Sequence, residues 1–175
     1  MKRRTSREKG NALIEFTLVG IPLIFVLISI FEMARGMWIY DTLAHAVKEG
    51  TRYAAVHGVN CVPVPADPSS NDCAVSIADI AARIQNAGVG LPADQLTLTF
   101  SAGSGAPTTC LLQNCLTLKT KPWPPSPNNA AGLPVSISGV FPFQSAIAFF
   151  WPGVARSMIF PTFNLPASAR EAILF

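Results

Sequence analysis

The strongest constraint on this chain is an apolar run without any charged residue, FTLVGIPLIFVLISIF, at Phe16–Phe31. Extended back to Ala12, the run reaches 20 residues and includes one acid, Glu15. A helix of about 20 residues spans the hydrocarbon core of a bilayer, which is roughly 30 Å thick. We therefore predict one transmembrane helix at residues 11–32. A carboxylate is costly inside hydrocarbon, so Glu15 needs an explanation.

The charges around this run predict its orientation. Residues 1–10 form a basic leader with one acid, Glu8, and five basic residues: Lys2, Arg3, Arg4, Arg7 and Lys9. Basic residues flank membrane helices on the cytoplasmic side, so we expect a cytoplasmic N-terminus. From Leu18 onward the chain has eight basic and eight acidic residues. Nucleic-acid binding needs a basic face on the folded part, so this neutral body predicts no nucleic-acid partner.

A cleaved secretory signal peptide is the alternative explanation of the same run. The run is longer than the usual apolar core of a signal peptide. The sequence that follows, SIFEMARGMW, offers no good small-residue cleavage site. Both explanations export the rest of the chain.

The chain has four cysteines, and export makes disulfide bonds between them possible: Cys61, Cys73, Cys110 and Cys115. An even number of cysteines in an exported domain indicates disulfides, and four cysteines allow three connectivities. We favour the local pairs Cys61–Cys73 and Cys110–Cys115, because each closes a short polar loop. A zinc site is the alternative, but neither pair has C-x-x-C spacing.

The helical pattern continues beyond the membrane run. Over residues 33–58, apolar residues recur every three or four positions, as in an amphipathic helix. The predicted stripe comprises Met33, Met37, Tyr40, Leu43, Ala44, Val47 and Ala54. Gly58 provides a C-terminal stop. We therefore expect one nearly continuous helix from Asn11 to His57.

Residues 59–175 are predicted to form a small extracytoplasmic α+β domain. Isoleucines at helical spacing predict one short helix at residues 75–87. Alternating apolar and polar residues predict strands in DQLTLTFSAG, CLTLKT and PVSISGVF, with a last strand in FNLPASAREAILF. The stretch AGSGAPTTCLLQN is expected to be a hairpin connection, and GVNCVPVPADPSSNDC and KPWPPSPNNAAG are expected to be loops. The predicted class is α+β, with a small antiparallel sheet beside a long helix.

The apolar stretch FPFQSAIAFFWPGVARSMIF, at residues 141–160, fits no regular element. Pro142 and Pro152 bracket too few residues to cross a bilayer. We expect a core turn packed on the long helix. The alternative is an exposed apolar surface that touches membrane or a partner.

No catalytic signature is present. His45 and His57 are the only histidines, and both fall on the predicted long helix. The sequence contains no H-E-x-x-H, G-x-S-x-G or phosphate-binding glycine loop. We therefore predict a protein that is not an enzyme and needs no cofactor or metal. The alternative, a membrane-anchored hydrolase, would need titratable residues that converge in the folded domain.

The leader and the carboxylate together resemble a known export signal. A basic leader that ends in Gly10, followed by Glu15 and an apolar helix, resembles the class III signal of type IV pilins. The resemblance implies that a prepilin peptidase cuts between Gly10 and Asn11. Glu15 would then be the fifth residue of the mature chain and would act in assembly. Asn11 departs from the Phe or Met that often begins mature major pilins.

A wider stretch, residues 9–58, closely resembles the TadE-like family of the tight-adherence (Flp) pilus system. The shared traits are the Glu-Phe start of the apolar run, EMAR after it, and AVKEGTRYAA. The resemblance returns weakly at PVSISGVFPF and LPASAREA.

The resemblance implies a pseudopilin or minor pilin that assists assembly of adhesive pili. Its partners would be the membrane, prepilin peptidase, other pilins or pseudopilins, and the Tad secretion machinery. It would lie in the bacterial inner membrane as a single-pass protein with a periplasmic C-terminal domain, or associate with the pilus. The alternative is a membrane-anchored periplasmic binding module that never joins a filament.

Overall fold

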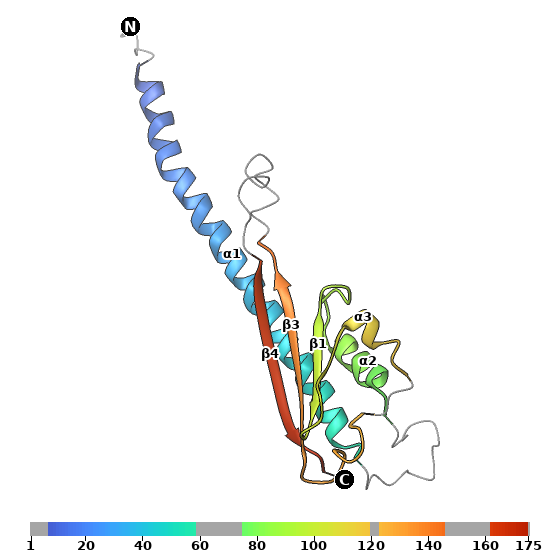
Figure 1. Cartoon of the computed structure of the whole chain (residues 1–175). Coiled ribbons are helices and arrows are strands. Elements are labelled where there is room, and N and C mark those ends of the chain that lie inside the picture. Colours follow the sequence, from blue (N-terminus) through green and yellow to red (C-terminus); the bar gives the residue numbers. More distant parts are fainter. Residues whose placement is uncertain (1–6, 59–74, 120–122, 146–161, 175) are drawn as a thin grey trace, which may run out of the picture. The chain divides into compact units, whose positions relative to one another are not determined.

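The computed structural model describes residues 7–58, 75–119, 123–145 and 162–174 (Figure 1). The elements in chain order are α1 (Arg7–Ala55), α2 (Ile77–Ala87), β1 (Thr97–Ala102), β2 (Thr108–Leu111), α3 (Leu112–Cys115), β3 (Pro134–Phe143) and β4 (Phe163–Ala172). The predicted α+β class is confirmed. The chain divides into two compact units, of which the first contains α1 through Met37 and the second contains Trp38–Gln144 with the C-terminal strand.

The helix α1 has 49 residues, from Arg7 to Ala55, and is about 70 Å long at 1.5 Å per residue. The predicted long helix is therefore confirmed, although it begins earlier and ends slightly earlier than expected. Pro22 lies inside the helix without ending it. Its missing N–H leaves one helical hydrogen bond unmade, and membrane helices tolerate this residue.

Part of the predicted apolar stripe of α1 is buried in the core. Leu43, Val47 and Ala54 are fully buried, together with Ala46, Gly50, Thr51 and Ala55. Met33, Met37 and Tyr40, which belong to the same predicted stripe, are 69%, 67% and 46% exposed. Within the described residues, contacts of α1 with the core begin at Ile39 and Leu43. Within the described part of the chain, Met33 and Met37, which precede them, are exposed.

The four strands form one antiparallel sheet in the order β2-β1-β3-β4. Alternate residues of β1 and β3 are buried in the core, among them Leu98, Phe100 and Ile137. A Cβ added at Gly139 would lie 3.0 Å from Val47 and 3.1 Å from Leu43. The helix therefore crosses the sheet closely at Gly139, where a larger residue would not fit without a shift.

The other sheet face carries small hydroxyl side chains. Thr99 pairs with Thr109 on β2 and with Ser138 on β3, and Ser138 pairs with Ser168 on β4. The hydroxyls of Thr99 and Thr109 lie 3.0 Å apart and share a hydrogen bond. This alternation of apolar and polar residues is why the sequence located β1 and β3 correctly.

The short helix predicted at residues 75–87 is confirmed as α2. Ser76 caps it: its hydroxyl accepts a hydrogen bond from the backbone N–H of Asp79, whose carboxylate accepts from the backbone N–H of Ser76 at 2.9 Å. This reciprocal capping box satisfies two N–H groups that helix starts otherwise leave unpaired. Ile80 and Ile84 then enter the core beside Gly50 of α1.

The strand predicted in CLTLKT is wrong. The second strand lies earlier, at Thr108–Leu111, and the chain then turns into α3. The backbone N–H of Leu116 donates to the carbonyl of Leu112 at 3.1 Å, which continues helical rather than extended geometry. Leu116 and Leu118 both pack against the core from turns. Their i, i+2 spacing matches the period of a strand, although the chain is not extended here.

Two further predictions, the last strand and the proline-rich loop, are confirmed, and a third lies mostly outside the described residues. The last strand is confirmed as β4. Residues 123–132 contain no helix or strand, as predicted for the proline-rich loop, and Trp123 from this loop packs edge-on against Phe100 with ring centroids 5.5 Å apart. Most of residues 141–160, where we expected a core turn, lies outside the described residues. Its first three residues belong to β3.

Candidate functional site

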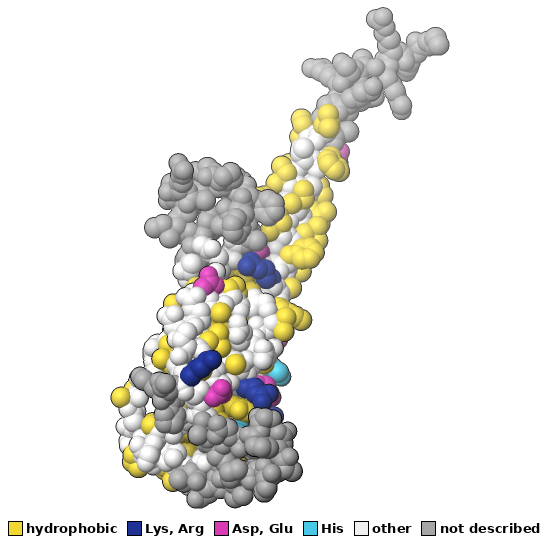
Figure 2. Space-filling model, turned by 90° about the vertical axis from the view of Figure 1, so that its right-hand side faces the viewer, with side chains coloured by type: hydrophobic (Ala, Val, Ile, Leu, Met, Phe, Trp, Pro, Cys, Tyr) yellow, Lys and Arg dark blue, Asp and Glu magenta, His cyan; other side chains and the backbone are white. Residues whose placement is uncertain are grey.

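The N-terminal part of α1 exposes large hydrophobic side chains on all sides. Exposed fractions of 49–75% are found for Leu13, Ile14, Phe16, Leu18, Val19, Ile21, Leu23, Ile24, Phe25, Val26, Leu27, Ile30 and Phe31. Figure 2 shows them as a yellow surface along the helix. This helix is long and apolar enough to cross a membrane. Such a surface is far larger than the apolar patches that water-soluble monomers expose.

The polar side chains inside the apolar run are satisfied by the helix itself. The hydroxyl of Thr17 donates to the carbonyl of Ile14 at 2.9 Å, and that of Ser29 donates to the carbonyl of Phe25 at 2.8 Å. In hydrocarbon, polar groups must find their partners within the protein. These two hydroxyls therefore add little cost to membrane insertion.

Charged residues bracket the apolar run. Glu15 lies at one end and Glu32 at the other, 17 residues later, which is about 25 Å along the helix. Glu32 lies 3.9 Å from Arg35 in an ion pair. Trp38 follows and is 68% exposed. Tryptophan at the end of a span is typical of the interface between lipid and water.

Glu15 is exposed among apolar neighbours on α1. No ion pair with Glu15 occurs among the residues whose side chains are described. Gly10 and Asn11, the predicted processing residues, lie on the same helix, although their side chains are outside the description. One helical turn separates Asn11 from Glu15, so the two residues share a helix face.

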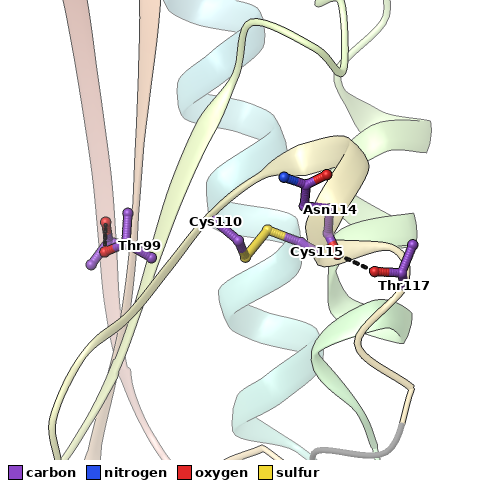
Figure 3. Close-up of a disulfide and its surroundings, with 6 residues drawn as sticks. Thr99, Cys110, Asn114, Cys115 and Thr117 are labelled. Carbon is purple, nitrogen blue, oxygen red and sulfur yellow. Dashed lines mark hydrogen bonds between the residues drawn. A yellow bond between two sulfur atoms is a disulfide. The ribbon is translucent and has the colours of Figure 1, made fainter.

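Of the predicted disulfides, Cys110–Cys115 is present. It joins β2 to the end of α3, with a Cα–Cα distance of 5.6 Å (Figure 3). Cys115 is fully buried, and its neighbour Thr117 donates a hydrogen bond of 2.7 Å to the carbonyl of Asn114. The disulfide thus links β2 to the end of α3, where the chain enters the turn found in place of the predicted strand. Cys61 and Cys73 lie outside the described residues.

The two histidines lie on different surfaces. His45 is exposed on α1. His57 follows the end of α1 and approaches the carbonyl of Tyr53 through Nδ1 at 2.6 Å. Among the described residues, no group of three or more His, Cys, Asp or Glu side chains is placed to hold a metal ion.

The sequence analysis did not predict a groove between α1 and α2 that is lined by two arginines. Arg52 and Tyr53 of α1 face Arg83 and Asn86 of α2 across it. No sequence pattern indicates this group of residues, because it depends on how α2 packs on α1.

Comparison with known proteins gives one match, and it covers most of α1. A family model described as TadE-like protein matches residues 10–52. No curated protein and no solved structure matches the chain. The match covers Gly10, Glu15 and the whole apolar run, and it suggests a role in tight-adherence pilus systems. The predicted resemblance to the TadE-like family is thereby confirmed for residues 10–52.

Proposed function

We propose that this protein is a non-enzymatic, single-pass pseudopilin that assists assembly of adhesive pili of the tight-adherence type. The observation that carries the proposal is the coincidence of the TadE-like match with a fully exposed apolar helix. Leucine, isoleucine and phenylalanine on such a helix suit both lipid and the packed helices of a filament. The side chains that face lipid in the bilayer can therefore face other helices in a filament.

The orientation follows from the basic leader. With residues 1–10 in the cytoplasm, the body that begins near Trp38 lies in the periplasm, and the protein belongs to the bacterial inner membrane. A disulfide between Cys110 and Cys115 suits an oxidising compartment. Prepilin peptidase acts on the cytoplasmic side in this scheme and cleaves between Gly10 and Asn11.

Glu15 has a defined part in the proposal. Cleavage creates an ammonium group at Asn11, one turn from the Glu15 carboxylate on the same helix or opposite it on a neighbouring one. Buried ion pairs contribute to register more reliably than to stability. Glu15 would thus set the axial position of the subunit against other pilins and the Tad secretion machinery. Before assembly, a location near the cytoplasmic interface lowers the cost of its charge.

The test is complementation of a strain that lacks this chain. We expect Glu15→Ala to reach the membrane at the wild-type level but to leave the cells without pili in electron micrographs. Asp41→Ala is the matched control, because it removes an exposed acid of the same helix outside the apolar run. Normal piliation with Glu15→Ala would contradict the assembly role.

A membrane-anchored periplasmic binding module is the second candidate, and the arginine-lined groove between α1 and α2 favours it. Such a module would leave pili unchanged when it is deleted. Genes for a secretion ATPase and a prepilin peptidase beside this gene would favour the pseudopilin.

A further inference from the structure

The groove between the last turns of α1 and α2 has the size of a ligand site. Its volume is about 550 Å³, within the range of small-molecule and short-peptide pockets. The lining residues are Glu49, Arg52, Tyr53, Val56, Arg83, Asn86 and Ala87, all in one compact unit. Figure 2 shows basic, acidic and histidine side chains close together on one side of the body.

The groove carries more positive than negative charge. Arg52 lies 3.7 Å from Glu49, and their side chains are 63% and 45% exposed. An exposed pair of this kind contributes at most about 1 kcal/mol. Arg52 can therefore exchange Glu49 for the carboxylate of a ligand. Within the described part of the chain, no carboxylate lies within ion-pair distance of Arg83. Two guanidinium groups thus face one acid.

Arg83 lies over the ring of Tyr53 in a cation–π contact. Its guanidinium carbon lies 4.8 Å from the centroid of the Tyr53 ring. The ring of His57 lies 4.4 Å from that of Tyr53, and its Nδ1 donates to the Tyr53 carbonyl at 2.6 Å. A carbonyl only accepts, so Nδ1 carries the proton. The contact with Tyr53 favours this position of the Arg83 guanidinium. A guanidinium presents a planar fork of N–H donors that matches a carboxylate.

We propose that this groove binds an acidic peptide segment of an exported partner protein. Arg83 receives a carboxylate with two parallel hydrogen bonds, and Arg52 receives a second acid. The Asn86 amide meets the peptide backbone, while Val56 and Ala87 contact its apolar atoms. A free anion would use the arginines alone and leave the rest of the groove unfilled. The proposal does not depend on a role in pili.

The experiment measures peptide binding to the full-length protein in nanodiscs. The probe is a dye-labelled, acetylated and amidated Gly-Asp-Phe-Glu-Gly peptide, followed by fluorescence anisotropy at about 0.15 M salt. The matched control peptide is Gly-Asn-Phe-Gln-Gly, which keeps the shape and loses both charges. We expect the acidic peptide to bind at least about tenfold more tightly, as expected from a charge-assisted hydrogen bond.

Two variants locate the site. Arg83→Ala is expected to weaken binding of the acidic peptide about tenfold. Asn86→Asp, an exposed change that does not disturb the core, is expected to weaken it through repulsion. Arg170→Ala is the control, because it removes the same charge from an exposed site on β4 and should change the affinity less than about twofold.

Three results would overturn the proposal. The first is equal binding of the two peptides, or no binding. The second is an equal loss for Arg83→Ala and Arg170→Ala, which would show general charge attraction. The third is displacement by inorganic phosphate as effective as displacement by unlabelled peptide, which would show a simple anion site.

Discussion

The backbone N–H of Leu174 donates a hydrogen bond of 2.9 Å to the carbonyl of Ala55, the last residue of α1. A helix leaves its last four carbonyls without helical partners. Here the chain segment that follows β4 satisfies one of them. The segment after β4 is therefore hydrogen-bonded to the end of the long helix.

This relationship predicts a selective effect of proline at position 174. Leu174→Pro removes the donor, whereas Leu174→Ala keeps it, and the Leu174 side chain is 61% exposed. We expect Leu174→Pro to lower the free energy of unfolding by about 1 kcal/mol more than Leu174→Ala does. Thermal unfolding in detergent, followed by circular dichroism, measures the difference. Equal melting temperatures would show that the bond contributes nothing.

Gly50→Ala is predicted to destabilise the protein, although alanine is the better helix former by about 1 kcal/mol. A Cβ at Gly50 would overlap Ile84, whose Cδ1 would lie 2.7 Å away. Overpacking of this kind costs about 1–3 kcal/mol. Gly20→Ala is the matched control on the same helix, because there a Cβ would meet Phe16 at 3.9 Å.

A double variant checks the cause of the Gly50 effect. If the clash with Ile84 is responsible, Gly50→Ala combined with Ile84→Ala should cost less than the sum of the two single changes. Additive losses would mean that the effect of Gly50→Ala arises elsewhere.

The capping box predicts a pH dependence of stability. Hydrogen bonds from the side chain and backbone of Ser76 hold the pKa of Asp79 below its usual value. A carboxyl group with a lowered folded-state pKa stabilises the fold above its unfolded pKa, near 4, and loses this contribution as the pH falls through the folded pKa. The stability difference between wild type and Asp79→Asn should be constant at neutral pH and shrink below about pH 4. A difference that stays constant down to pH 2 would contradict this.

The cap itself has a separate test. Ser76→Ala removes the hydroxyl that accepts from the Asp79 N–H. We expect a loss of about 1 kcal/mol, as for other serine caps. Ser104→Ala, an exposed change in the turn between β1 and β2, serves as the control and should be neutral. A neutral Ser76→Ala would show that the cap does not support α2.

The Cys110–Cys115 disulfide predicts a loss of stability on removal. Closing so short a loop contributes about 2 kcal/mol in the chain-entropy description. The variant with both cysteines changed to alanine keeps the buried position of Cys115 apolar and should melt at a lower temperature than wild type. The same melting temperature under oxidising conditions would show that the bond is dispensable.

Much of the fold could be predicted because it depends on local pattern. The apolar run of α1 and the alternation in β1 and β3 specify their elements residue by residue. The strand predicted around Leu116 and Leu118 failed, because two leucines at i, i+2 also fit turns that are held by Cys115 and by backbone bonds to Leu112.

Contacts between elements could not be predicted, because no local sequence pattern indicates them. The helical period predicts an apolar stripe on α1 but does not say where its contact with the core begins, so the exposure of Met37 could not be predicted from the sequence. The groove formed by Arg52 and Arg83 depends on the packing of α2 on α1. Gly10 and Glu15 were identified through resemblance, and the structure adds that both lie on one helix.

The most direct test of the proposed role is the mass of the chain isolated from bacterial membranes with and without prepilin peptidase. We predict a chain that begins at Asn11 when the peptidase is present and a chain that keeps its leader when the peptidase is absent. Gly10→Ala should keep the leader in both cases. An intact Met1 in the chain of a functional pilus apparatus would contradict the account.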